Sequence, residues 1–183
     1  MKSPPDRLAA LDVYLRDMMR SLECGAPYSA LAMALSIPDI CGSIQYPDSK
    51  VGERYICWVA EWGKILTMSA EDCYAIRCAY LHNGSGVFSQ SSAKAANFAR
   101  IEFTVGQTVG GWASKADPIA QDVPKGKIRT PIEDFCKGMV NAAMAWRIHS
   151  EHDSRILAAV DGLMQIEPAE PPPPGKPVSR PSS

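Results

Sequence analysis

Arg77 and His82 lie five positions apart and form the most concentrated pair of chemically active side chains in the sequence. A guanidinium is a planar fork that matches the oxygens of a phosphate. An imidazole can accept and return a proton near neutral pH. RNA can be cut without a metal when the ribose 2′-OH attacks the adjacent phosphorus. The pair therefore predicts metal-independent cleavage of RNA, with no cofactor and no metal.

The segment that carries this pair, residues 69–84, predicts one complete short helix. Ser69 is a natural N-cap, and Asp72 stands at the acidic position of a capping box. Asn83 and Gly84 predict a left-handed C-terminal cap. Three apolar residues at helical spacing form its stripe: Cys73, Ile76 and Tyr80. His82 is thus expected near the helix C-terminus, where the helix dipole favours a protonated imidazole.

The geometry of a helix limits what the pair can do alone. Residues five apart on an α-helix are rotated by about 140° and displaced by about 7.5 Å along the axis. One regular helix is therefore not expected to aim Arg77 and His82 at a single atom. Either the last turn unwinds near Gly84, or a second copy of the helix from another protomer completes the site. The second option predicts a two-fold homodimer.

The spacing by itself is not specific, because Arg147 and His152 repeat it. That second match is expected at the polar end of another helix, where basic residues often only complement the dipole. His149 and His152 could help to bind a metal, but no third ligand is identifiable, so a polar helix end is predicted there. For Arg77 the structural alternative is an ion pair with an acid on its own helix, and for His82 it is capping of the last carbonyls.

The helix from Asp72 to Gly84 resembles the characteristic helix of HEPN-domain proteins, whose shared motif is Arg, four to six residues, then His. The resemblance is close over this helix and loose over the helical layout of residues 6–165. It implies an all-α and commonly dimeric fold. For many members it also implies metal-independent endoribonuclease activity in toxin–antitoxin, antiviral defence or RNA-processing systems. By position, Arg77 would bind and polarise the scissile phosphate, and His82 would transfer the proton.

Three neighbours of the pair are predicted to support it: Asp72, Tyr80 and Asn83. The residue after the motif arginine is often polar in the family and is Cys78 here. This departure leaves open a non-catalytic HEPN-like module that binds a nucleotide or a protein partner. A helical scaffold, in which Arg77 and His82 only finish a helix, is the third reading. The expected partners are RNA or a nucleotide, a second copy of the chain, and a cognate antitoxin or regulatory protein.

Composition places the chain among globular proteins, with 183 residues, 46% of them hydrophobic and 21% charged. The net charge of −1 provides no global basic field, so a role with RNA would need a local basic patch. The six cysteines contain no CxxC pair and are expected to be small buried residues. No secretory signal and no apolar run of bilayer length are apparent, which predicts a cytoplasmic protein without membrane contact.

The apolar spacing around the motif helix predicts a mainly α fold of five to six helices with a small β-hairpin. The resemblance implies that these helices form a HEPN-like bundle in which the hairpin is an insertion. Further helices are predicted at 6–22, 27–36, 51–66, 131–148 and 154–164, with a loop over 37–48 because Pro38 stops the second helix. Residues 86–90 and 99–105 are expected to form the hairpin, and 106–127 a long mobile loop. One domain is predicted over 1–166, followed by a disordered Pro-rich tail over 167–183.

Overall fold

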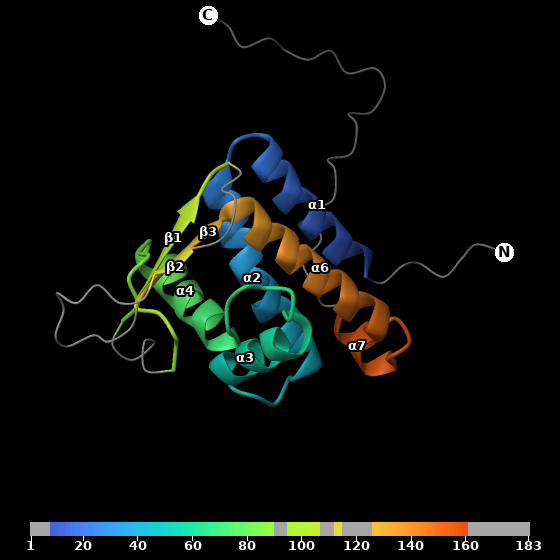
Figure 1. Ribbon diagram of the computed structural model, residues 1–183. Helices are drawn as coiled ribbons and strands as arrows, with labels where there is room; N and C mark the ends of the chain where they lie inside the picture. The colour runs from blue at the N-terminus through green and yellow to red at the C-terminus, as the bar shows by residue number, and fades with distance from the viewer. Residues whose placement is uncertain (1–7, 90–94, 107–111, 115–125, 161–183) are drawn as a thin grey trace, which may run out of the picture.

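The computed structural model describes residues 8–89, 95–106, 112–114 and 126–160 (Figure 1). The helices in these ranges are α1 (Ala9–Glu23), α2 (Pro27–Gln45), α3 (Val51–Trp62), α4 (Ala70–Asn83), α6 (Ile132–Ser150) and α7 (Ser154–Val160). The strands are β1 (Arg100–Thr104), β2 (Trp112–Ser114) and β3 (Lys127–Pro131). The predicted mainly α class is confirmed. None of the described helices combines the length and apolar character needed to cross a bilayer.

The second helix, α2, lies at the centre of the bundle and packs against α1, α3, α4, α6 and α7 (Figure 1). Its sequence is almost entirely apolar or small, and Asp39 is its only charged residue. A helix that is apolar on nearly all sides is expected to be buried, which fits this central position. The largest fully buried side chains of the surrounding core include Trp58 of α3 and Trp146 of α6. A charge on such a helix needs a partner, and the site described below supplies it.

The prediction that Pro38 ends the second helix is wrong, because α2 continues through it to Gln45. A proline inside a helix removes one hydrogen bond and costs about 3 kcal/mol. On both sides of it, however, the buried stripe continues, with Ile37 before the proline and Cys41 and Ile44 after it, at 0%, 0% and 9% exposure. Burying one large aliphatic side chain contributes about 1.5–3 kcal/mol, so packing against the neighbouring helices outweighs the proline. The predicted loop over 37–48 is therefore mostly helix.

The motif helix α4 forms as predicted. The Ser69 hydroxyl accepts a hydrogen bond from the Asp72 N–H at 3.1 Å, which completes the first half of the capping box. Gly84 adopts the left-handed conformation with φ of 61°, and its N–H donates to the Tyr80 carbonyl at 2.8 Å. The other predicted helices also form, and α3 stops at Trp62, before residue 66. The predicted end of the last helix, residues 161–164, lies outside the described residues. Of the six cysteines, only Cys41, Cys73 and Cys136 are buried, and Cys24 and Cys57 are exposed.

The sheet lies beside α4 at one side of the bundle, and its strand order is β1-β3-β2 (Figure 1). The central strand β3 runs parallel to β1 and antiparallel to β2. The segment predicted as the first strand of the hairpin, 86–90, forms no regular strand in its described residues and contributes one antiparallel bridge, between Val87 and Arg100. Segment 106–127 is not a single loop, because it contains β2 and the first residue of β3. The prediction that this segment is mobile also covers residues 107–111 and 115–125, which lie outside the described residues. The predicted disordered tail over 167–183 lies outside them as well.

Candidate active site at the C-terminal end of α4

Arg77 and His82 lie within hydrogen-bond distance of each other on one helix. The Nη1 atom of Arg77 is 3.0 Å from the Nε2 atom of His82. The expectation that one regular helix does not aim both side chains at a single atom rested on backbone positions alone, and it did not foresee this direct contact. The long arginine side chain covers the axial displacement, while α4 stays helical to Asn83. Neither an unwound last turn nor a second protomer is needed for this contact.

Asp39 of α2 anchors the Arg77 guanidinium through a different nitrogen. The Nε atom of Arg77 donates to Oδ2 of Asp39 at 2.8 Å, and the two side chains are 17% and 21% exposed. Burial would lower the pKa of Arg77, but the hydrogen bond to Asp39 and its charge outweigh this effect and raise the pKa. These contacts use two of the five N–H donors of the guanidinium. Asp39 therefore positions the arginine without consuming its capacity to bind an anion.

The other carboxylate oxygen of Asp39 gives a further indication. Its Oδ1 atom is buried and has no hydrogen-bond partner among the described residues. Leaving a buried acceptor unsatisfied costs about 1–3 kcal/mol. Such atoms also occur elsewhere in the described core, for example Oη of Tyr55 and Nε1 of Trp146. The unsatisfied oxygen therefore marks Asp39 as a polar group at the site without distinguishing a functional role of Arg77 from a structural one.

The contact also defines which nitrogen of His82 carries a proton. Because a guanidinium can only donate hydrogen bonds, Nε2 of His82 must be the acceptor. This contact requires an imidazole without a proton on Nε2, in contrast to the protonated form that the helix dipole was expected to favour, and the remaining proton is assigned to Nδ1. His82 is exposed, so a substrate or partner can reach it. A neutral, accessible imidazole is the form that a general base requires.

Cys78 follows Arg77 in the helix and influences this assembly. It is half-buried, and hydrogen bonding to its sulfur adds to the effect of Asp39 in raising the pKa of Arg77. Burial raises the pKa of the neighbouring Tyr74 hydroxyl, and hydrogen bonding to Cys78 raises it further. A thiol is a weaker hydrogen-bonding group than an amide, a carboxylate or an imidazole. Cys78 therefore occupies the motif position as a weak polar contact of the arginine.

Asp72, predicted as a supporting residue, lies at the opposite end of α4 from His82, about 15 Å along the axis. It is 1% exposed. Its Oδ1 atom accepts from the backbone N–H groups of Asn97 and Phe98 at 2.6 and 3.2 Å, and its Oδ2 atom accepts from Nδ2 of Asn97 at 3.0 Å. Asp72 thus connects the segment before β1 to the start of the motif helix by hydrogen bonds. Its support of the site is structural, because it holds these two elements together.

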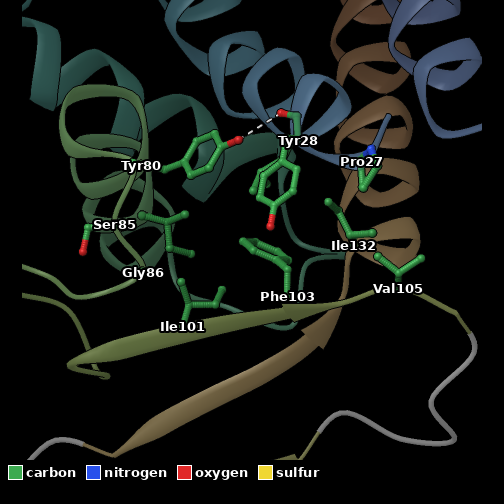
Figure 2. A pocket seen from close by; sticks show the side chains of 12 residues that line it. Pro27, Tyr28, Tyr80, Ser85, Gly86, Ile101, Phe103, Val105 and Ile132 are labelled. Atoms are coloured by element: carbon green, nitrogen blue, oxygen red, sulfur yellow. Dashed lines mark hydrogen bonds between the residues drawn. The ribbon is translucent and has the colours of Figure 1, made fainter. Parts of the chain in front are cut away.

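Tyr80 faces a cavity of about 240 Å³ between α2, α4, β1 and the start of α6. Figure 2 shows the rings of Tyr28, Tyr80 and Phe103 gathered there, and the Tyr80 hydroxyl donates to the Tyr28 carbonyl at 3.0 Å. Neither Arg77 nor His82 lines this cavity. Tyr80 therefore lies beside the Arg77–His82 pair, in the wall of a separate cavity, and among the described residues the structure shows no direct support of the pair by its side chain. Asn83, the third predicted supporting residue, is exposed at the last position of α4, next to His82.

The second Arg-x4-His match is arranged differently. Arg147 of α6 pairs with Asp12 of α1, with 3.0 Å between Nε and Oδ1. The ring of His149 packs against Trp62 with 5.1 Å between centroids. His152 lies beyond Ser150, the last residue of α6, in the turn that precedes α7. In the part of the chain that the structure describes, no group of three or more His, Cys, Asp or Glu side chains could hold a metal ion.

Asp39 is the site residue that the sequence prediction missed. The prediction placed it in a loop after Pro38, where its position relative to Arg77 could not be argued. Continuation of the apolar spacing through Ile37, Cys41 and Ile44 was the signal that could have found it. With α2 extended, Asp39 becomes the only charge on a central helix and calls for a cationic partner.

No protein-family model, no curated protein and no solved structure matches this chain.

Proposed function

We propose that this protein is a metal-independent endoribonuclease of HEPN-like architecture, with Arg77 and His82 as its catalytic residues. The observation that carries the proposal is the 3.0 Å contact between Nη1 of Arg77 and Nε2 of His82 at the exposed end of α4. Asp39 holds the same guanidinium at 2.8 Å. A phosphate-binding fork and a proton acceptor are thus present within one hydrogen bond of each other.

In the proposed reaction, Nε2 of His82 takes the proton of a ribose 2′-OH while that oxygen attacks the adjacent phosphorus. Arg77 donates hydrogen bonds to the non-bridging oxygens, where negative charge develops in the transition state. The bond from phosphorus to the 5′-oxygen of the next nucleotide breaks, and that oxygen takes up a proton. The products are a 2′,3′-cyclic phosphate and a 5′-hydroxyl. Neither water nor an electron acceptor is consumed.

Binding of the phosphate would exchange one hydrogen bond for another. Arg77 now donates to His82, and an arriving phosphate oxygen would replace the imidazole as acceptor. The anchor at Nε would persist, since Asp39 does not occupy the Nη1 atom. This exchange frees Nε2 of His82 when substrate is present. We include a two-fold homodimer in the proposal, in which the protonated imidazole of His82 from the second copy donates its proton to the leaving oxygen.

The decisive test is cleavage of a defined single-stranded RNA by the purified chain in the presence of EDTA. The proposal expects a cyclic phosphate at the new 3′ end, and loss of cleavage in His82→Ala. His152→Ala is the matched control, because it removes the histidine of the second match. Equal, contaminant-level cleavage by wild type and His82→Ala would exclude the ribonuclease.

A toxin or defence role is the biological form of this proposal, with a cognate antitoxin or regulatory protein as partner. It expects that overexpression stops growth and that His82→Ala relieves the arrest while the variant accumulates to the same level. Growth arrest that His82→Ala does not relieve would separate any toxicity from the site on α4.

A non-catalytic module that binds a nucleotide is the second candidate function. The cavity beside Tyr80 favours it, because three aromatic rings surround a volume of about 240 Å³. This is slightly below the roughly 300 Å³ at which sites for drug-sized ligands begin, so the cavity suits a small ligand. Calorimetric titration with nucleoside monophosphates would show affinity that Tyr80→Ala weakens, with no turnover and little effect of Arg77→Ala or His82→Ala, because neither of these side chains lines the cavity. Titrations without heat would count against this module.

A further inference from the structure

The strand β1 presents two chemically different faces. Figure 2 shows Ile101 and Phe103 pointing from β1 toward the helices. Side chains alternate along a strand, so Arg100 and Glu102 lie on the opposite face. In the parallel pairing with β3, Arg100 stands beside Lys127 and Glu102 beside Arg129. We call these four residues, Arg100, Glu102, Lys127 and Arg129, the basic sheet face.

The basic sheet face places three cations around one carboxylate. Oxygens of Glu102 lie 2.8 Å from Lys127, 3.0 Å from Arg129 and 3.5 Å from Arg100. The hydrogen bonds from Lys127 and Arg129 lower the pKa of Glu102 to about 2, so it is ionised at neutral pH. Three positive charges and one negative charge give this small face a charge of +2, whereas the whole chain has −1. This is the local basic patch that a nucleic-acid role requires in a chain without a global positive field.

Stability alone does not account for the cluster. The side chains of Arg100, Lys127 and Arg129 are 56%, 41% and 49% exposed. Exposed ion pairs contribute about 0–1 kcal/mol, since water and salt screen them. The same exposure means that the cations can turn toward an arriving phosphate at little cost. The carboxylate therefore gathers the cations on one face while leaving them available.

The basic sheet face begins close to the candidate active site. Arg100 forms the antiparallel bridge with Val87, and the N–H of Ile101 donates to the Gly86 carbonyl at 2.9 Å. Gly86 follows His82 by four residues, and an extended chain of that length spans at most about 14 Å. A strand of a few nucleotides held at the end of α4 can thus reach this edge of the sheet.

We propose that the basic sheet face binds the phosphodiester backbone of the RNA strand that is held at Arg77 and His82. The choice of RNA as the polyanion rests on the proposed function, while the charge and exposure of the face stand independently of it. Contacts of this kind position a strand without reading its bases. The face would therefore increase affinity for RNA of any sequence.

Binding of a fluorescent single-stranded RNA is measured by anisotropy at several salt concentrations, using the full chain with His82→Ala so that the RNA stays intact. In this background, Arg100→Gln, Lys127→Gln and Arg129→Gln should each weaken binding severalfold. Each should also flatten the plot of log affinity against log salt by about 0.7. Arg20→Gln is the matched control, since this arginine belongs to an exposed ion pair on α1, and it should change nothing.

The sharpest variant is Glu102→Gln. It removes the negative charge from the middle of the face, so RNA should bind severalfold more tightly and with a steeper salt dependence. A merely structural role for Glu102 predicts unchanged or weaker binding, because the cations would lose their common partner. Thermal unfolding of each variant shows whether the fold persists.

Unchanged affinity and salt dependence in all four variants would overturn the inference. So would binding of this face to vesicles with anionic lipids when RNA does not bind. The fate of the proposed function is read separately, from cleavage by the chain with His82 intact. Cleavage without dependence on the basic sheet face would refute only this inference. RNA binding that depends on the face, with no cleavage, would refute only the ribonuclease.

Discussion

The ends of α4 and α6 carry the same Arg-x4-His spacing and use it differently. At α4, Arg77 reaches both Asp39 of the central helix and His82 of its own helix. At α6, Arg147 pairs with Asp12 of α1, a carboxylate with 38% side-chain exposure. The difference begins with helix length, because α4 continues past its histidine to Asn83, whereas α6 ends at Ser150, before His152.

This comparison shows that spacing in the sequence does not define a site. A histidine inside the helix has a fixed relation to the arginine, while one in the following turn does not. The source of the carboxylate matters as well. Asp39 comes from a buried, otherwise uncharged helix and is shielded, so its pair with Arg77 is stronger than a surface pair. The following experiments separate the two ends.

The largest effect is expected for His82→Ala, which should reduce RNA cleavage by about 10²- to 10⁴-fold, the usual contribution of a general base. His152→Ala should cleave like the wild type. Rates are measured with a quenched fluorescent RNA under single-turnover conditions. Since His82 is exposed, thermal unfolding should show its stability within about 0.5 kcal/mol of wild type. If both variants lost RNA cleavage equally, the two helix ends would not differ in function.

Asp39→Asn should have the next largest effect. Loss of the charge-assisted hydrogen bond to Arg77 should lower the free energy of unfolding by about 1.5–3 kcal/mol and slow cleavage, because the arginine loses its anchor. Asp12→Asn, which weakens the pair with Arg147, should cost about 1 kcal/mol or less and leave cleavage unchanged. Urea titrations give both free energies. If Asp12→Asn destabilised the protein more, shielding would not be what distinguishes the pairs.

Gly84→Ala tests how the two helices terminate. Gly84 has φ of 61°, and an added Cβ would meet no atom within 4 Å, so its cost is conformational only. We expect about 1–2 kcal/mol of destabilisation, because an alanine is strained in the left-handed region. At α6 the C-cap residue Glu151 is right-handed, and Glu151→Ala should change stability by about 0.5 kcal/mol or less. Thermal unfolding of both variants makes the comparison, and equal changes would contradict it.

The smallest effect concerns pH at the end of α6. Hydrogen bonds from Arg155, through its side chain and backbone, lower the pKa of Asp153 from its ordinary 3.8. A depressed pKa in the folded state adds stability above the unfolded value, which is lost as pH falls through the folded value. Asp153→Asn should therefore have a slightly lower Tm than wild type at pH 7, and the difference should vanish well below pH 3.8. If the Tm difference between the two proteins persisted in acid, the substitution would act through packing or hydrogen-bond geometry and not through the charge of Asp153.

The sequence predicted the parts of the site that local signals specify. Ser69, Asp72 and Gly84 define where α4 starts and stops, so the helix and its arginine and histidine were placed correctly. The contact between Arg77 and His82 was not predictable from backbone rotation, since side-chain reach decides it. Asp39 was missed because the local effect of Pro38 is weaker than burial against neighbouring helices, which acts at long range.

The sheet shows the same limit. Ile101 and Phe103 alternate with polar residues, so β1 was predicted, but its main partner β3 begins at Lys127, far along the chain. Period-two spacing reports that a strand has two faces and does not report which strand lies beside it. The basic sheet face exists only through this parallel pairing, and the sequence therefore gave no direct signal of it.

Asp72 links the start of the motif helix to the sheet. The same carboxylate takes part in the capping box of α4 and accepts the backbone N–H groups of Asn97 and Phe98. These interactions should therefore be lost in a single local unfolding event, a cooperative unit that spans the first turn of α4 and the approach to β1. Amide hydrogen exchange at Asn97 and Asp72 is expected to proceed at one common opening free energy, although 25 residues separate them.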